Sequence, residues 1–147
     1  MERATHRLYA VVCWTTLGRL PLIRSAVRAT MEGHLIALCR RLDVEPVSVT
    51  VLCDRVHLLV RTKPTHSIAR LVGALKRGGR ESLQSAGEPV RWGAGFAAIS
   101  VGSREVRRVM RLLAELAERE ERREGGRRRL RRRPRGPNTG GSALRPR

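Results

Sequence analysis

The chain has 147 residues, which is enough for one domain with a hydrophobic core and a tail. Its net charge of +18 favours a polyanion as partner, with nucleic acid first. No apolar run is long enough to span a membrane, no signal-peptide pattern is present, and the three cysteines form no C-x-x-C pair. We therefore expect a cytoplasmic protein with reduced thiols and no membrane partner.

The positive charge is shared between two parts of the chain. Residues 119–147 contain twelve arginines and three glutamates, a net +9, and an equal charge remains on residues 1–118. We predict one domain over residues 1–118 and a basic, disordered tail over residues 119–147, because the tail has little to bury. A solvated basic surface without a ligand, or an arginine-rich composition inherited from GC-rich coding, would also explain the charge.

The first half of the chain reads as a strand, a helix and two more strands. Residues 7–16 are apolar on both alternations, as in a central strand covered on both faces. Residues 22–42 carry apolar side chains at steps of three and four, which predicts an amphipathic helix. Residues 46–53 and 55–61 alternate again, so we expect two antiparallel strands joined by a tight turn.

The second half adds a helix, a short strand and a long helix. From Ile68 an apolar stripe predicts a helix whose end is weakened by the glycine pair 78–79. Residues 81–95 read as irregular, residues 96–101 as a strand, and a helix from Arg104 fades near the start of the tail. The order β-α-β-β-α-β-α predicts an α+β, ferredoxin-like fold, with an antiparallel sheet and an added C-terminal helix.

One strand combines a core face with a polar face. In the segment 55–61 the even-numbered residues are apolar and suit the core, while the opposite face carries Arg55, His57 and Arg61. A histidine in this place is either a metal ligand or an ordinary histidine on the surface of a sheet. Spacing alone does not decide between these two readings.

Four segments, taken in order between about residues 9 and 112, resemble the single-tyrosine HUH transposases of the smallest bacterial insertion sequences. They are YAVVCWTT, VLCDRVHLLVRTKP, IARLVGALKRGGR and RWGAGFAAISVG. They resemble the family's first strand, its histidine–hydrophobic–histidine strand, the following helix, and its Trp-x-x-Gly segment with the last strand. The resemblance implies a mobile-element protein that acts on DNA in transposition, a form of DNA recombination.

The chemistry of the resembled family needs two histidines on one strand, which hold Mg²⁺ or Mn²⁺, and a tyrosine on the last helix that attacks DNA. Here Arg55 replaces the first histidine, and arginine has no lone pair to give. The tyrosine position falls on Val109 or Met110, which have no nucleophilic oxygen. We therefore expect no intact catalytic residue and no cofactor, with His57 as the remnant of a metal site.

DNA binding is the activity we expect to survive. The resemblance implies single-stranded or hairpin DNA as the partner and a homodimer as the binding form. Trp14 and Trp92 are expected to have core roles rather than to stack on bases. Six cationic residues are the candidates for phosphate contacts: Arg55, Arg61, Arg70, Lys76, Arg77 and Arg80.

The hypothesis that follows is a DNA-binding family member that has lost strand cleavage and transposition. Three alternatives stay open. The first is an active transposase with an unconventional nucleophile such as Ser100, Ser103 or a cysteine. The second is an RNA-binding module, although the aromatic stacking motif of that class is absent. The third is the functionless product of a decaying element.

Overall fold

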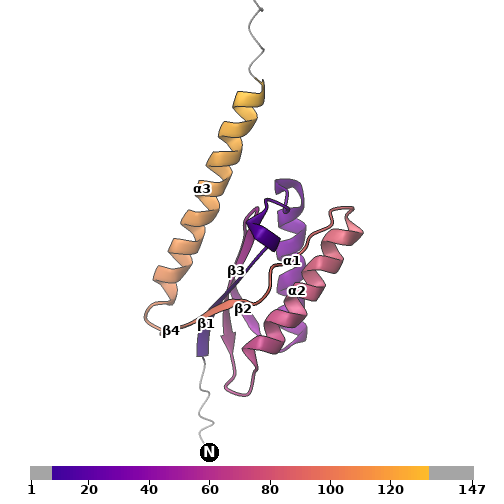
Figure 1. Ribbon diagram of the computed structural model, residues 1–147. Helices are drawn as coiled ribbons and strands as arrows, with labels where there is room; N and C mark the ends of the chain where they lie inside the picture. The colour runs from indigo at the N-terminus through magenta and orange to yellow at the C-terminus, as the bar shows by residue number, and fades with distance from the viewer. Residues whose placement is uncertain (1–7, 133–147) are drawn as a thin grey trace, which may run out of the picture.

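The structure, a computed structural model, describes residues 8–132 (Figure 1). The strands form one antiparallel sheet in the order β2-β3-β1-β4. This confirms the predicted α+β, ferredoxin-like fold with its added C-terminal helix. The elements are β1 (Leu8–Thr15), the short 3-10 helix η1 (Leu17–Arg19), α1 (Ser25–Arg41), β2 (Glu45–Val51), β3 (Arg55–Thr62), α2 (Ile68–Ser85), β4 (Ala97–Val101) and α3 (Val106–Arg132).

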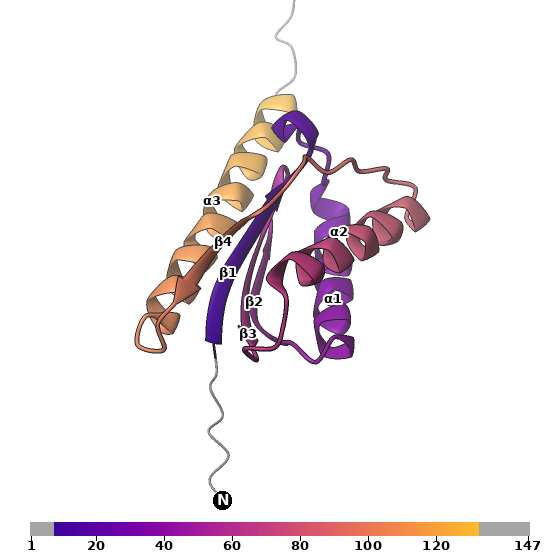
Figure 2. The same cartoon turned by 60° about the horizontal axis from the view of Figure 1, so that its bottom comes forward.

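The hydrophobic core lies between the sheet and the two helices α1 and α2, which cover one face (Figures 1 and 2). Val56, Leu58 and Val60 of β3 are fully buried there, as are Val12 and Trp14 of β1. Each buried side chain of this size contributes about 1.5–3 kcal/mol. Since side chains alternate along a strand, the residues between them lie on the opposite face of the sheet.

The end of α2 differs from the prediction. The helix continues through Gly78 and Gly79 and ends only at Ser85, so residues 81–85 are helical rather than irregular. A Cβ at Gly78 would collide with the side chain of Leu38 in α1, and one at Gly79 would lie 3.0 Å from Met31. The two glycines therefore allow α1 and α2 to approach closely, and they do not terminate the helix.

The last helix, α3, lies on the sheet face opposite α1 and α2 (Figure 2). It continues to Arg132, so the prediction of disorder from residue 119 is wrong for residues 119–132. The rest of the predicted tail, residues 133–147, lies outside the described residues. None of the helices between residues 8 and 132 combines the length and the hydropathy needed to cross a membrane.

Candidate functional site

Arg55 and His57 lie side by side on the sheet face that α3 occupies. The Nε of Arg55 donates a hydrogen bond to His57 Nε2 at 3.1 Å, and Arg55 Nη1 lies 3.6 Å from Asp54 Oδ1. On the neighbouring strand β1, Cys13 faces His57 across the pair, with its Sγ 4.0 Å from His57 Nε2. Arg55 thus engages the lone pair of His57 Nε2, one of the two ring nitrogens through which a histidine can bind a metal ion.

The same contacts fix the protonation of His57. Burial lowers the pKa of the imidazole, and the positive charge of Arg55 lowers it further, while Asp54 acts in the opposite direction. His57 is therefore neutral at pH 7. Because its Nε2 accepts from Arg55, the ring proton is on Nδ1.

These residues do not fit Mg²⁺ or Mn²⁺. A metal ligand must offer a free lone pair, and the Nε2 lone pair of His57 is engaged by a cation that also repels other cations. Within residues 8–132, no three His, Cys, Asp or Glu side chains are grouped in a way that would hold a metal ion.

The positions expected for a nucleophile offer none. Val109 is half-buried on α3, and Met110 is 37% exposed. Cys13 is next to His57, but burial raises the pKa of its thiol even though Arg55 acts against this, so the thiol is protonated at pH 7. Burial and the nearby Glu120 raise the pKa of Cys53 to about 11.

The two serines considered as nucleophiles are not placed to use His57. Cys13 pairs with His57 on one side and with Ala97 of β4 on the other, so these three side chains share one face. Ser100 lies three residues beyond Ala97 and therefore on the opposite face of the sheet. Ser103 is exposed in the turn before α3.

Glu120 and Glu124 of α3 lie near Cys53, at the end of the sheet where β2 is followed by β3. Glu120 Oε1 accepts a hydrogen bond from the backbone N of Cys53 at 3.1 Å and lies 3.7 Å from Arg28 Nη2, and Glu124 also pairs with Arg28. Burial acts to raise the pKa of Glu120, but the hydrogen bonds from Cys53 and the charges of Arg28 and Arg55 outweigh it and lower the pKa.

Sequence reasoning missed both glutamates. Both lie in the predicted tail, where acidic residues among many arginines are typical of a solvated segment. A signal was available, because the inward stripe of Val109, Leu113 and Leu116 continues at steps of four to Glu120 and Glu124. The helical period therefore did extend past residue 118, with carboxylates in place of apolar side chains.

The structure brings together three of the six cationic residues predicted to bind nucleic acid. Arg55 lies on the α3 face of the sheet, and Arg61 is paired with Glu45 of β2 at 3.1 Å. Lys76, Arg77 and Arg80 line a hollow of about 440 Å³, which we call the basic hollow. Its residues are Leu17, Lys76, Arg77, Arg80, Arg91 and Trp92.

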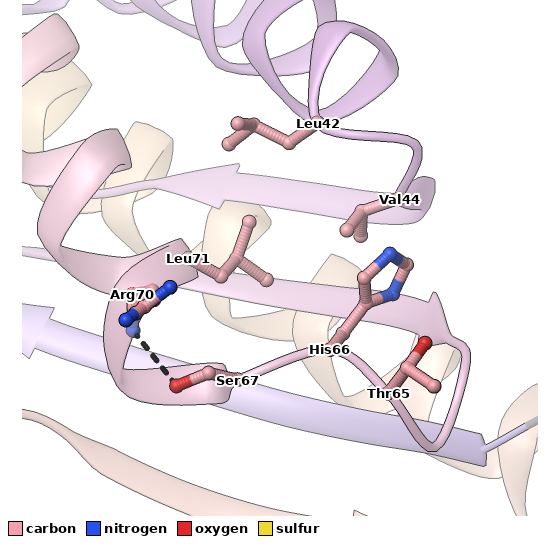
Figure 3. Close-up of a pocket in the computed structure, with 7 residues that line it drawn as sticks. All are labelled: Leu42, Val44, Thr65, His66, Ser67, Arg70 and Leu71. Carbon is pink, nitrogen blue, oxygen red and sulfur yellow. Dashed lines mark hydrogen bonds between the residues drawn. The ribbon is translucent and has the colours of Figure 1, made fainter.

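The sixth cationic residue, Arg70, lies in a separate hollow of about 250 Å³ near the start of α2 (Figure 3). Leu42, Val44 and Leu71 give this hollow apolar walls, and the ring of His66 points towards Val44. Within the part of the chain that the structure describes, Arg70 is the only arginine or lysine that lines it. This hollow therefore lacks the group of cations that a phosphate chain needs.

The walls of the basic hollow are held by hydrogen bonds. Lys76 Nζ donates to the carbonyl oxygens of Gly93 and Gly95 at 2.8 and 3.2 Å, and Trp92 Nε1 donates to the Lys76 carbonyl at 2.7 Å. Trp92 also packs edge-to-face on buried Trp14, with ring centroids 6.0 Å apart. Lys76 and Trp92 thus position the loop that carries Arg91.

Three exposed guanidinium groups remain for a ligand in the basic hollow: Arg77, Arg80 and Arg91. Among the described residues, none of the three has an acidic group within 4.0 Å. Guanidinium groups suit paired hydrogen bonds to phosphate oxygens. The hollow is therefore a cationic surface with an aromatic wall and no internal counter-charge.

Comparison with known proteins agrees with the resemblance seen in the sequence. No curated protein matches the chain. Nine chains of solved structures match it, and two of them illustrate the shared fold. A candidate transposase from Deinococcus radiodurans R1 has a TM-score of 0.61 and 21% identity, over 80% of this chain and 96% of that one. A REP-associated tyrosine transposase bound to a REP hairpin has a TM-score of 0.57 and 11% identity, over 77% and 68%.

Likeness at these identities shows the fold and no more. The family is shown by the sequence itself, because the family model described as Transposase IS200 like matches residues 4–114, about three quarters of the chain. This chain belongs to the IS200-like transposase family.

Proposed function

We propose that this family member binds single-stranded or hairpin DNA and does not cleave it through a phosphotyrosine. The observation that carries the proposal is the hydrogen bond from Arg55 Nε to His57 Nε2. It engages the Nε2 lone pair, leaves the ring proton on Nδ1 and places a positive charge beside the imidazole, so neither ring nitrogen has a free lone pair for a metal ion. An arginine in this position is itself suited to a DNA phosphate, because it is 25% exposed.

The position of the sole tyrosine supports the loss of cleavage. Tyr9 lies in β1, four residues before Cys13, and Cys13 pairs with His57. Four residues of strand span roughly 13 Å, so the Tyr9 hydroxyl has no close access to a phosphate held at His57. The helix α3, where the family carries its tyrosine, has Val109 and Met110 instead.

The basic hollow supports DNA binding. Arg77, Arg80 and Arg91 offer three guanidinium groups on one surface. Each phosphate that they neutralise releases condensed counterions, which makes such binding strong at low salt. A structural neighbour carries a bound REP hairpin, which agrees with a DNA partner for this fold.

The proposal includes a homodimer formed at the edge strand β4. Ala97, Ala98, Ile99 and Ser100 are all exposed, and Ile99 is 67% exposed. Among residues 8–132, β4 pairs with β1 on one side only, so its other edge offers backbone groups to a further strand. A second copy of the chain satisfies that edge and covers Ile99.

The test is a paired assay with a labelled single-stranded hairpin oligonucleotide, with and without Mg²⁺ or Mn²⁺. Gel shift measures binding, and a denaturing gel detects a covalent adduct. The expected result is a shift without an adduct and without dependence on metal. A metal-dependent adduct would refute the loss of cleavage, and stronger binding to duplex RNA than to hairpin DNA would favour the RNA-binding alternative.

Matched variants locate the binding surface. Arg77→Ala with Arg80→Ala removes two charges from the basic hollow, and Arg40→Ala with Arg41→Ala removes two exposed charges from the end of α1. We expect the first pair to weaken binding about tenfold or more at moderate salt, and the second about twofold. Equal losses would mean that only net charge matters and that the basic hollow is not the site.

A further inference from the structure

The helical extension of α3 builds a second cationic hollow. This hollow has a volume of about 290 Å³ and lies between the start of α1 and the C-terminal part of α3. Four arginines line it: Arg24 from the start of α1, and Arg127, Arg128 and Arg131 from α3. If residues 119–132 were disordered, as the sequence predicts, this hollow would not form.

The charges around this second hollow are not balanced. Its acidic residue, Glu124, is paired with Arg28, and Arg24 is paired with Glu88. Arg127 and Arg131 have no acidic group within 4.0 Å among residues 8–132. Like charges held close together repel one another, so a bound anion would stabilise this arrangement.

Two contacts shape this second hollow before any ligand arrives. Arg128 Nη2 donates to Ser25 Oγ at 2.8 Å, which ties α3 to the first residue of α1. The pair between Arg28 and Glu124 holds the same stretch of α3 from the inner side. Because these contacts fix the backbone, Arg127 and Arg131 are presented on an ordered helix.

We propose that the second hollow binds a phosphate group of the same DNA strand that occupies the basic hollow. The inference rests on the proposed function. The segment from η1 to α1 lines both hollows, with Leu17 in the first and Pro21 in the second. Extended chain between these two residues spans at most roughly 14 Å, so a single strand reaches both sites.

The test compares two double variants that remove the same charge from the same helix. Arg127→Ala with Arg131→Ala alters the second hollow, whereas Arg119→Ala with Arg123→Ala alters exposed arginines that do not line it. Alanine favours a helix, so both variants are expected to fold, and circular dichroism checks this. Affinity for a single-stranded oligonucleotide is measured over a range of salt concentrations.

We expect the first double variant to bind about tenfold more weakly and to lower the salt dependence by about 0.7 for each lost phosphate contact. The control should lose about threefold or less, with a nearly unchanged slope. Equal losses from the two variants would overturn the inference and leave the proposed function standing, because wild-type binding would persist.

A second measurement uses inorganic phosphate as the probe and the thermal unfolding midpoint as the readout. Phosphate should raise the midpoint of the wild type and of the control by the same amount, and that of the Arg127 and Arg131 variant by less, because only the basic hollow remains in the variant. If phosphate acts in this way but oligonucleotide affinity is the same in all three proteins, the assignment to the DNA strand is overturned. If the wild type binds no oligonucleotide, the proposed function fails. If the variant responds to phosphate as strongly as the wild type, the second hollow is not an anion site.

Discussion

Arg28 of α1 forms an ion pair with Glu124 of α3, 96 residues further along the chain. The Arg28 side chain is only 11% exposed, and it also lies 3.7 Å from Glu120. Replacing it with glutamine leaves two partly buried carboxylates without their cation. We expect Arg28→Gln to lower the free energy of unfolding by about 2 kcal/mol, measured by urea denaturation.

The control for this prediction is an ion pair within α3 alone. Arg122 and Glu118 lie 3.4 Å apart, and both side chains are well exposed. Arg122→Gln should cost about 0.5 kcal/mol or less, because exposed pairs are screened by solvent. A similar cost for both substitutions would show that burial of the Arg28 pair contributes nothing, and that α3 is held by its apolar stripe alone.

The close approach of α1 and α2 predicts opposite effects for two glycine substitutions in one helix. Gly78→Ala would collide with Leu38 and should destabilise the protein by about 1–3 kcal/mol. At Gly73 the new methyl group would meet only the end of Arg77 at 3.6 Å, so Gly73→Ala should stabilise by about 0.5–1 kcal/mol through helix propensity. Thermal unfolding of both variants measures this, and stabilisation by Gly78→Ala would contradict the packing described.

His57 predicts a loss of stability towards acid pH. Its folded-state pKa lies below the usual 6.5, because of burial and the charge of Arg55. As the pH falls through about 6.5, the unfolded chain therefore takes up the proton first, so stability is full above this pH and declines below it. His57→Gln should show a flatter stability profile between pH 7 and 5, and a profile identical to that of the wild type would contradict the depressed pKa.

Arg55→His tests whether the guanidinium is what excludes a metal. The substitution places two imidazoles at i and i+2 on one face of β3, next to Asp54. We expect Mn²⁺ or Zn²⁺ to raise the unfolding midpoint of this variant and to leave that of the wild type unchanged. Arg55→Ala is the control, because it removes the cation without adding a ligand. An equal metal response in the alanine variant would show that the second imidazole is not a ligand.

Much of this fold could be predicted from the sequence, because alternation and helical periodicity mark the elements directly. The alternation of Val56, Leu58 and Val60 placed His57 on the opposite face of β3, where the structure has it. The prediction for the end of α2 failed for a physical reason. The glycine pair 78–79 predicts a weakened helix end, whereas the packing of Gly78 against Leu38 is a contact between distant residues and leaves no local signal in the sequence.

The candidate site was less predictable than the fold. The spacing of Arg55 and His57 indicated that they are neighbours, but it could not show that Arg55 donates to the imidazole. Among the cationic residues, the sequence could not distinguish Arg77, which lines the basic hollow, from Arg61, which is paired with Glu45. That distinction depends on which acidic residue the fold places beside each arginine.

The exposed edge of β4 leads to a prediction about assembly. Ile99 is 67% exposed on a strand whose outer edge pairs with no other strand between residues 8 and 132. If two copies join through this edge, a lysine at this position places like charges opposite each other and removes apolar contact. We expect the wild type to sediment as a dimer and Ile99→Lys as a monomer.

The control is Leu42→Lys, which changes a 39% exposed leucine at the end of α1 and should leave the dimer intact. A monomeric wild type, or dissociation of both variants alike, would rule out β4 as the interface.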